Sequence, residues 1–307
     1  MVEVSVIIVS WNTKEILREC LESVYRETND IELEVILIDN ASTDGSAEMV
    51  QQEFPQVVLI CNSKNRGFAA ANNQGIEVAK GRFVLLLNPD TVVLDRAIQK
   101  TIAFADEHPR AGAVGIRNTH ANGDLQKNCF RYASVLNLLI STFGLHRLFS
   151  RSKFFGRERM LWWDYADSRK VDVVAGCYML VRKEVIDQIG GLDETYFMYG
   201  EEMDWCWRMQ NAGWEVWFYC GATIIHYGGM SSAQNPAEMQ CEAQRSLLYF
   251  IQKRQGKLGR AVCRGLLMLS GAFRLVYWGF RWIGARGDVR ELSAKKFRQA
   301  MIATAGR

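Results

Sequence analysis

Short apolar runs alternate with helical patterns through residues 1–107, and this alternation limits the fold more than any other feature. Residues 4–9 form a β-branched run typical of a strand buried on both faces, and a helical pattern of apolar side chains follows at 16–24. The cycle then repeats, with strands expected at 33–38, 57–61 and 83–87 and helices from 44, at 68–79 and at 95–107. This order predicts an α/β fold with a Rossmann-like, mainly parallel central sheet flanked by helices.

Polar residues directly follow several of these strands. They are Asn12, Asp39-Asn40, residues 62–67 and Asn88-Pro89-Asp90. Ligands of parallel sheets bind beyond the carboxyl ends of the strands. We therefore expect the ligand of this protein at these positions.

The formal net charge of +3 is the sum of two oppositely charged parts. Residues 1–244 hold 23 Lys and Arg against 32 Asp and Glu, which gives a charge of −9. Residues 245–307 hold 14 basic and 2 acidic residues, which gives +12. A nucleic-acid surface would fit this basic tail, but no binding motif supports it, so we expect no nucleic-acid partner.

The apolar stretch 266–283 suggests a membrane span, but Arg274 and Arg281 interrupt the ~20 apolar residues that a spanning helix needs. On a helical wheel the basic residues from Lys257 to Arg286 fall on one side, and apolar side chains cover much of the rest. This pattern predicts a helix that lies on an anionic membrane surface. The alternative is a helix packed on the sheet or on a second subunit. Packing on a second subunit would make the protein a homo-oligomer.

Two further features concern the surroundings of the chain. The segment 143–163 interleaves basic with aromatic side chains and is either a solvated loop or a docking surface for an anionic, partly apolar partner. The eight cysteines are scattered without a CxxC pair, and the N-terminal apolar run is too short for the core of a signal peptide. We therefore expect a reducing, cytoplasmic compartment.

Glu201, Glu202 and Asp204 place three carboxylates within four residues, flanked by aromatic side chains. Repulsion between them raises their proton affinity unless a cation compensates, and a general base is often built in this way. A solvated helix N-terminus would also favour acids. Because the flanking aromatic residues disfavour full solvation, we expect a functional site.

Seven motifs stand in a recognisable order: VSVIIVSWN, LIDNASTDGS, NRGFAAANNQG, LLLNPDT, GCYMLVRKEV, GGLDETYFMYGEEMDWCWR and IIHYGGMSS. Together they resemble a family-2 glycosyltransferase of the GT-A fold, most of all the rhamnosyltransferase-type enzymes of bacterial surface polysaccharide assembly. The resemblance covers residues 4–232. It implies a GT-A domain at 1–235, with a nucleotide-binding half at 1–117 and an acceptor and catalytic half at 118–235. A basic, helical, membrane-associating extension would follow at 236–307.

The resemblance implies donor-binding roles for residues that follow the early strands. Asp39 would accept a hydrogen bond from the imide N–H of uracil or thymine, which suits a pyrimidine nucleotide. Asn12 and Asp44 would assist it. Ahead of the next helix, backbone N–H groups and a guanidinium would meet the nucleoside or the diphosphate, and these belong to Asn65, Arg66 and Gly67.

The metal-binding DxD motif of the family takes the form Asn88-Pro89-Asp90 in this chain. Asp90 would be the main carboxylate ligand of a divalent ion, Mg²⁺ or Mn²⁺, that bridges to the donor diphosphate. Asn88 would contribute a neutral oxygen at most. His226 matches a histidine that completes the metal site in related enzymes, and a histidine ligand suits Mn²⁺ better than Mg²⁺.

The resemblance places the catalytic base at Glu202, where the family has the second acid of an ED pair. Glu202 would take the proton of the acceptor hydroxyl while that oxygen attacks the sugar C1 opposite the diphosphate. Asp204 is the reserve base or orients the acceptor, and Arg208, one helical turn on, pairs with it or with the diphosphate. Trp163 and Trp205 would stack on acceptor sugars, unless they belong to the core.

These features together predict an inverting glycosyltransferase that transfers a sugar, rhamnose from dTDP-rhamnose, to a polyprenyl-diphosphate-linked glycan. The enzyme would be peripheral on the inner face of the cell membrane. Two alternatives stay open. One is an enzyme of the same fold that uses a UDP-sugar, and the other is a catalytically silent nucleotide-sugar-binding protein, which Asn88 and the glutamate at the base position suggest.

Overall fold

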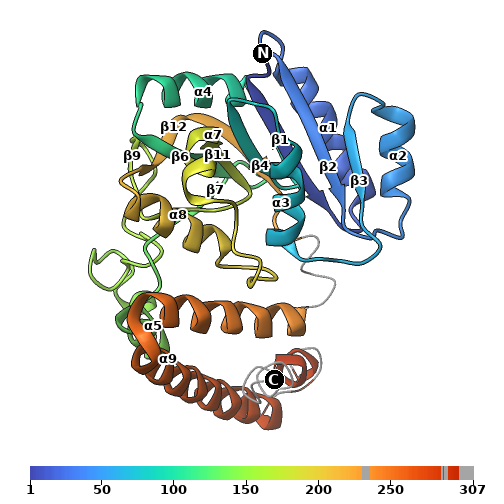
Figure 1. The fold of residues 1–307 in the computed structure, drawn as a ribbon. Coiled ribbons are helices and arrows are strands. Elements are labelled where there is room, and N and C mark those ends of the chain that lie inside the picture. The colour runs from blue at the N-terminus through green and yellow to red at the C-terminus, as the bar shows by residue number, and fades with distance from the viewer. Residues whose placement is uncertain (230–235, 285, 287–289, 297–307) are drawn as a thin grey trace. The chain divides into compact units, whose positions relative to one another are not determined.

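The computed structural model describes residues 1–229, 236–284, 286 and 290–296 (Figure 1). The strands are β1 Val4–Ser10, β2 Leu33–Asp39, β3 Val58–Cys61, β4 Phe83–Leu87, β5 Thr91–Val93, β6 Ala111–Thr119, β7 Leu125–Gln126, β8 Cys129–Phe130, β9 Arg169–Lys170, β10 Val173–Val174, β11 Tyr178–Arg182 and β12 Glu215–His226. The helices are α1 Lys14–Glu27, α2 Ser46–Glu53, α3 Phe68–Val78, α4 Ala97–Glu107, α5 Val135–Thr142, α6 Leu145–Leu148, α7 Lys183–Ile189, α8 Glu201–Asn211 and α9 Pro236–Gly284. The end of the last motif, 230–232, and the end of the basic tail, 297–307, lie outside the described residues.

The central sheet has the strand order β3-β2-β1-β4-β11-β6-β12-β5. The first four of these strands run parallel, in a register that pairs Ser10 with Asp39 and Ile8 with Leu87. β11 then enters antiparallel between β4 and β6, and β12 runs parallel to β6. The expected α/β fold with a Rossmann-like sheet is confirmed, and β1, β2 and β4 end at the same edge.

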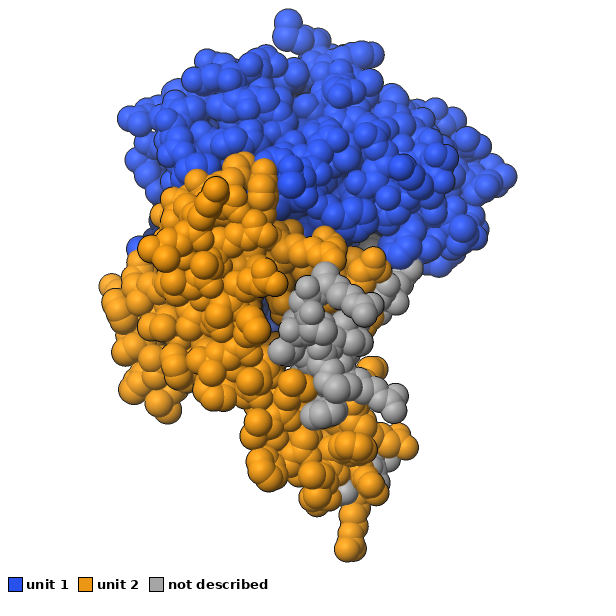
Figure 2. Space-filling view, turned by 60° about the horizontal axis from the view of Figure 1, so that its bottom comes forward, with its two compact units in different colours: residues 1–132, 163–234 blue, residues 133–162, 235–307 orange. Residues whose placement is uncertain are grey.

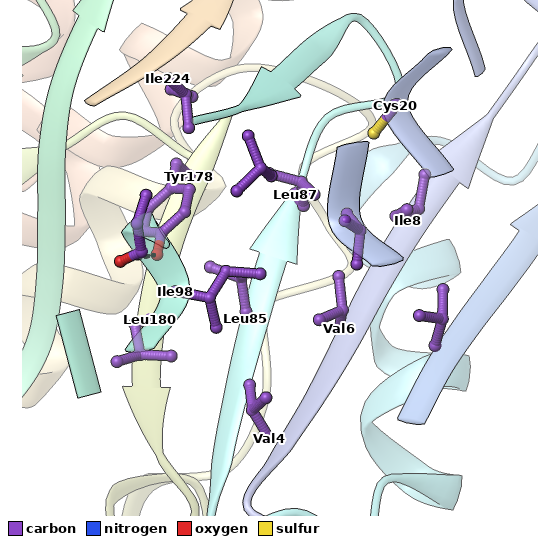
Figure 3. Packing of buried hydrophobic residues seen from close by; sticks show 14 of the residues in the cluster. Val4, Val6, Ile8, Cys20, Leu85, Leu87, Ile98, Tyr178, Leu180 and Ile224 are labelled. Carbon is purple, nitrogen blue, oxygen red and sulfur yellow. Dashed lines mark hydrogen bonds between the residues drawn. The ribbon is translucent and has the colours of Figure 1, made fainter. Parts of the chain in front are cut away.

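Helices cover both faces of the parallel half, which explains the continuous apolar runs of β1 and β4. On one face, Ile8 and Leu85 belong to a buried cluster that includes side chains of α1 and α4 (Figure 3). On the other face, α3 lies so close that a Cβ on Gly75 would meet the Ile7 Cγ2 atom at 2.6 Å. The scaffold that carries the strand ends is therefore packed from both sides.

Residues 171–181 do not form one continuous strand. β10 and β11 are separated by a loop whose backbone groups bond outside the main sheet ladder. Ala175 N donates to Asn128 O at 2.9 Å, and Asn88 N donates to Cys177 O at 3.0 Å. The break brings Cys177 to the end of β4, beside the polar residues expected to bind the ligand.

The chain forms two compact units, drawn in different colours in Figure 2. Unit 1 consists of residues 1–132 and 163–234, and unit 2 of 133–162 and 235–307. Unit 2 combines the extension expected at 236–307 with residues 133–162, which belong to the half expected at 118–235, because α5 packs with α9. Val135 N donates to Gln255 Oε1 at 3.2 Å, and Arg254 Nη1 donates to Ala133 O at 3.3 Å. Most of the segment 143–163 is therefore part of a packed helical unit.

Helix α9 consists of two arms that meet at Gly256, whose φ of 75° lies in the left-handed region that glycine adopts readily. The second arm exposes much apolar surface, with Leu258 and Ile283 exposed to 77% and 80%. Among the described residues, Glu238–Gly284 is the one helix long and apolar enough to cross a membrane, judged by length and composition alone. The sequence suggested that Arg274 and Arg281 rule out a membrane span. By length and composition, these two arginines alone do not rule it out.

Candidate active site

Asp39 ends β2 at the edge where β1 and β4 also end, and its side chain is buried. Its Oδ2 accepts a hydrogen bond from Ser42 N at 3.0 Å, whereas its Oδ1 is buried without a hydrogen-bond partner among the described residues. A buried acceptor without a donor is costly. The position therefore fits a ligand that supplies an N–H group, such as the imide of a pyrimidine base.

Asn12 and Asp44 are engaged with backbone groups of the same edge. Asn12 Oδ1 accepts from Thr43 N at 2.7 Å, and Asp44 accepts from Lys14 N at 2.9 Å and from Ser46 N at 3.1 Å. Burial raises the pKa of Asp44, but these hydrogen bonds and one from the Ser46 hydroxyl outweigh burial and lower it. Both side chains thus hold together the loops after β1 and β2.

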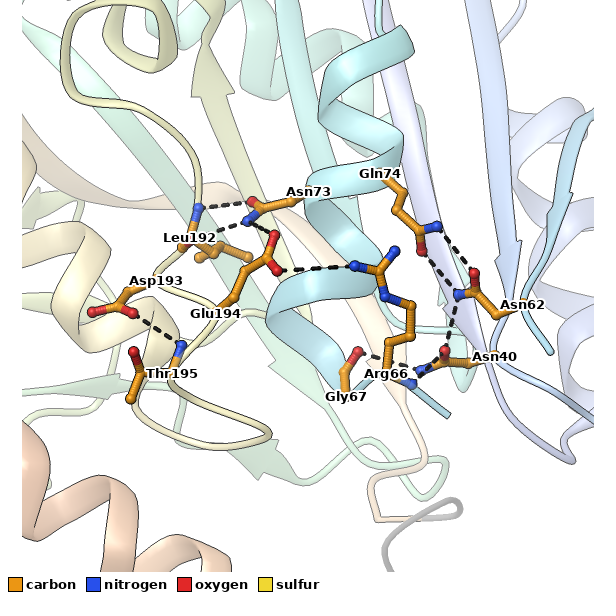
Figure 4. A network of polar contacts seen from close by, with 10 residues as sticks. All are labelled: Asn40, Asn62, Arg66, Gly67, Asn73, Gln74, Leu192, Asp193, Glu194 and Thr195. Atoms are coloured by element: carbon orange, nitrogen blue, oxygen red, sulfur yellow. Dashed lines mark hydrogen bonds and ion pairs between the residues drawn. The ribbon is translucent and has the colours of Figure 1, made fainter. Parts of the chain in front are cut away.

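Asn40 is the centre of an amide network at the end of β2 (Figure 4). Its Nδ2 donates to Asn65 Oδ1 at 2.8 Å, and its Oδ1 accepts from Asn62 Nδ2 at 3.1 Å and from Arg66 N at 3.0 Å. Asn65 Oδ1 also accepts from Gly67 N at 2.9 Å. The network holds the loop before α3 in one conformation.

The backbone N–H groups of Arg66, Gly67 and Phe68 already donate within the protein, contrary to the expectation that those of Arg66 and Gly67 meet the donor. Those of Arg66 and Gly67 donate into the Asn40 network, and Phe68 N donates to Phe197 O at 2.7 Å. Gly67 is required here, because its φ is 82° and a Cβ would lie 2.5 Å from Phe197 O. The Arg66 guanidinium is 39% exposed and lies 4.0 Å from Glu194, so it remains available to an anionic ligand.

Asp90 and His226 meet where β5 pairs with the end of β12. His226 Nε2 lies 3.3 Å from Asp90 Oδ1 and 3.4 Å from Asn88 Nδ2. On the other side of the ring, His226 Nδ1 lies 2.6 Å from Gln126 Oε1. Such a partner fixes the orientation of the imidazole, and here it directs Nε2 toward the carboxylate.

The Asp90–His226 pair fits part of a divalent cation site. Burial lowers the pKa of His226, but contacts with Asp90 and Cys177 outweigh burial and raise it to about 10. The imidazole therefore carries a proton against the carboxylate, and a metal ion would take the place of that proton. The described residues contain no cluster of three His, Cys, Asp or Glu side chains that could hold a metal ion. Further ligands would have to come from the donor diphosphate and water.

The loop between β10 and β11 connects this pair to α8. Cys177 O accepts from Asn88 N, and a Cβ on the neighbouring Gly176 would lie 3.5 Å from the Phe68 ring and 3.8 Å from Glu202 Cβ. Gly176 thus lies between the starts of α3 and α8. The strand-end residues, the Asp90–His226 pair and Glu202 converge on one region of unit 1.

The three acids in the first turn of α8 differ in their exposure. Glu201 is 5% exposed and Asp204 is fully buried, whereas Glu202 is partly exposed. Burial raises the pKa of Glu202 and that of Glu201, and the charge on Glu202 raises the pKa of Glu201 further. A general base needs both access and a raised pKa, so the geometry favours Glu202. The cluster is not a solvated helix terminus.

The buried Asp204 forms an ion pair with the partly exposed Arg208, whose Nε lies 2.9 Å from Asp204 Oδ2. The same guanidinium donates to Ile189 O at 2.9 Å and to Gly191 O at 2.6 Å, which ties α8 to the turn after α7. Asp204 has no surface that an acceptor could reach, and Arg208 is already committed to partners in the protein. Their geometry is that of a structural clamp rather than of a reserve base and a diphosphate ligand.

Trp163 and Trp205 lie in the core and present no face to an acceptor sugar. Trp205 is fully buried, and its Nε1 donates to Gly190 O at 3.0 Å. Trp163 is 3% exposed, and its ring stacks on that of Tyr165 with centroids 4.1 Å apart. The sequence left open whether these two tryptophans stack on acceptor sugars or belong to the core, and the structure places both in the core.

Residues 5–190 match the family model described as glycosyl transferase family 2, which covers more than half of the chain. The chain belongs to this family. Family membership agrees with the resemblance found in the motifs, and it makes the protein a glycosyltransferase.

Individual relatives support the same assignment. This glycosyltransferase is 28% identical over 258 residues to an N-acetylglucosaminyl-diphospho-decaprenol L-rhamnosyltransferase of Mycobacterium tuberculosis, over 78% of this chain and 81% of the relative. It is 24% identical to the glycosyltransferase GlyG of Streptococcus pneumoniae, over 66% of this chain and 62% of the relative.

A solved structure is similar in fold. The mannosyltransferase PcManGT of Pyrobaculum calidifontis, in complex with GDP-Man and Mn²⁺, superposes with a TM-score of 0.59 at 14% identity, over 99% of this chain and 85% of the other. The predicted GT-A architecture of this family-2 glycosyltransferase is thereby confirmed.

Sequence reasoning placed Asn40 at the ligand edge without giving it a role, and it missed Gln126 and Cys177, which also organise the site of this glycosyltransferase. Asn40 carried a usable signal, because it directly follows a strand whose end was expected to bind the ligand. Gln126 lies in a two-residue strand, and Cys177 lies in the loop between β10 and β11. Neither had a local pattern that marks it as functional.

Replacing Arg208 with Leu should lower the free energy of unfolding of this glycosyltransferase by about 3–5 kcal/mol, because Asp204 would stay buried without its cation. Lys183→Leu is the matched control, since Lys183 and Asp187 form an exposed pair of the same i,i+4 spacing. Its loss should cost about 0.3–0.5 kcal/mol. Urea denaturation followed by circular dichroism measures both. An R208L variant with unchanged stability and a raised KM for donor would instead return Arg208 to the donor site.

Proposed function

We propose that this glycosyltransferase transfers rhamnose from dTDP-rhamnose, with inversion, to a polyprenyl-diphosphate-linked glycan at the inner face of the cell membrane. The observation that carries the proposal is the 28% identity, across 78% of the chain, with a relative whose name contains both the rhamnosyl group and a diphosphate-linked lipid acceptor. The site of unit 1 is compatible with this chemistry.

The donor would bind along the edge where β1, β2 and β4 end. The thymine imide N–H would donate to Asp39 Oδ1, which lacks a partner among the described residues. The Arg66 guanidinium would pair with the diphosphate. Asp90 and His226 would hold the divalent ion, Mg²⁺ or Mn²⁺, which neutralises the departing diphosphate when it is bound. The mixed oxygen and nitrogen ligands favour Mn²⁺ of these two.

Glu202 would act as the general base on the acceptor. Its carboxylate would take the proton of the acceptor hydroxyl as that oxygen attacks C1 from the face opposite the diphosphate, so the configuration inverts. The Asp204–Arg208 clamp would position α8 and with it the base, without contact to either substrate.

A panel of nucleotide sugars with a polyprenyl-diphosphate-linked N-acetylglucosamine acceptor tests the proposal. We expect turnover with dTDP-rhamnose and at least tenfold lower kcat/KM with UDP-glucose and UDP-N-acetylglucosamine. A preference for a UDP-sugar would replace the donor and keep the chemistry. Donor binding in calorimetry without transfer or hydrolysis of any sugar would contradict an enzyme and favour the silent nucleotide-sugar binder, for which Asn88 in place of an acid is the supporting observation.

Replacing Glu202 with Gln should lower kcat by about 10²–10⁴-fold and change the Kd for dTDP-rhamnose little, because the base is lost and the donor contacts remain. The wild-type kcat/KM should fall with decreasing pH through the raised pKa of Glu202, above the usual value of about 4.3 for glutamate. The base must be deprotonated to act, so activity is retained above this pKa and lost below it. Unchanged turnover of E202Q, together with inactivity of a stably folded D204N, would transfer the role to Asp204.

Replacing Asp90 with Asn should reduce metal-stimulated transfer at least tenfold and weaken Mn²⁺ binding in the presence of dTDP, measured by electron paramagnetic resonance. Asp95→Asn is the control, because this nearby exposed carboxylate pairs with Lys100 at the surface. We expect it to behave as wild type. Full metal-stimulated activity of D90N would show that the metal is held elsewhere.

The inner membrane surface is the proposed location because the second arm of α9 exposes apolar side chains and the tail is strongly basic. Attachment to anionic vesicles should weaken as salt rises, since exposed charges are screened within about 3 Å at 1 M. Deletion of residues 258–307 should abolish attachment in a flotation assay. Retention after carbonate extraction would indicate a spanning helix. A salt-insensitive soluble dimer would favour packing of this helix on a second subunit.

A further inference from the structure

Unit 2 contains a cavity of about 830 Å³ between the segment 141–161 and the second arm of α9. Enclosed small-molecule sites typically measure about 300–1,000 Å³. Four cationic side chains line it, from Arg147, Arg159, Arg274 and Lys296, against the single carboxyl group of Glu158. Aromatic rings, including that of Trp278, complete the wall.

Within the part of unit 2 that the structure describes, little of the positive charge of this cavity is neutralised. None of the four cationic side chains forms a hydrogen bond or ion pair with another described residue. Burial, together with the charges of Arg147 and Arg159, lowers the pKa of His146 in the cavity wall. Burial also raises the pKa of Glu158, which favours its neutral form. The cavity is therefore suited to an anion with more than one negative charge.

Two polar atoms at the cavity wall also lack partners. The Thr142 Oγ1 and His146 Nδ1 atoms are buried without a hydrogen-bond partner among the described residues. Buried polar atoms of this kind are normally satisfied by protein, water or ligand. They add hydrogen-bonding capacity to the positive charge of the cavity.

An apolar groove continues from the cavity along α9. It is lined by Phe273, Val276, Tyr277, Phe280 and Arg281, and two of these rings, Phe273 and Tyr277, also line the cavity. Phe280 is 73% exposed, so the groove opens to the surroundings of unit 2. A ligand that fits both parts has a multiply charged head joined to a long apolar chain.

We propose that this cavity binds the diphosphate of the polyprenyl-linked acceptor and that the groove takes the first isoprene units of its chain. The inference rests on the proposed function for the identity of the lipid, and it assigns unit 2 a defined binding site for the acceptor. The four cationic side chains match a diphosphate better than the single phosphate of a bulk phospholipid. Because the groove beside the cavity is apolar, a free nucleotide would fill it less well than the chain of a lipid diphosphate.

Direct binding tests the site without reference to activity. Farnesyl diphosphate should change the fluorescence of the full-length protein saturably, and the change should be lost in W278F because Trp278 lines the cavity. An R147Q/R274Q variant should bind it at least tenfold more weakly. Arg264→Gln removes an exposed arginine from the same arm of α9 outside the cavity and should bind as wild type. Farnesol and inorganic diphosphate should each bind much more weakly than farnesyl diphosphate.

Equal losses in R264Q and R147Q/R274Q would mean diffuse electrostatic attraction and would overturn the proposal. Displacement of farnesyl diphosphate by phosphatidylglycerol vesicles at matched phosphate concentration would overturn it in favour of a bulk phospholipid.

Turnover then separates the two levels of inference. With the lipid-linked acceptor, R147Q/R274Q should raise the acceptor KM at least tenfold and leave the donor KM unchanged. With an octyl glycoside of the same sugar, wild type and variant should have equal kcat/KM. Specific binding of farnesyl diphosphate by a wild type without transferase activity would contradict the proposed function but support the proposed binding site. An active wild type whose cavity variants have a normal acceptor KM and bind farnesyl diphosphate normally would contradict only the proposed binding site.

Discussion

The parallel register of β1 with β2 and β4 determines where the functional groups of unit 1 lie. Ser10 pairs with Asp39 and Ile8 with Leu87, so the residues after these strands emerge together at one edge. A slip of one residue would turn every side chain of a strand to the opposite face. The burial of β1 and β4 between two helical layers prevents such a slip, because each strand would have to expose its apolar residues.

The polar residues around this edge fall into two groups, according to whether the protein already satisfies them. Asp44 and Arg208 have their partners in neighbouring loops and helices, and Asp204 is enclosed against Arg208, so these three residues stabilise the scaffold. Asp39 has an oxygen without a partner among the described residues, and Glu202 is partly exposed and has a raised pKa. Residues of the second group are available to a ligand, because a ligand can supply a hydrogen-bond donor that the described residues do not supply.

The sequence predicted what depends on local periodicity and order along the chain, and missed what depends on distant contacts. The strand pattern located Asp39 and Asp90 at the binding edge. It could not show that the Asp204 carboxylate is enclosed, because burial of a helical acid depends on the turn that it meets in space. Gln126 is joined to His226 across 100 residues, and this contact has no signature in either local sequence.

Unit 2 is built from two separate stretches of the chain, 133–162 and 235–307, so its parts are synthesised at different times. Ala133 contacts Arg254, 121 residues later, and at about 5–20 residues per second this partner follows roughly 6–24 s behind. Until then the apolar side of α5 has nothing to pack against, whereas most of unit 1 is already off the ribosome. Nascent chains would therefore hold a nearly finished unit 1 before the second arm of α9 exists. Products that end before α9 would expose the side of α5 that packs with α9 and would be prone to aggregate through it.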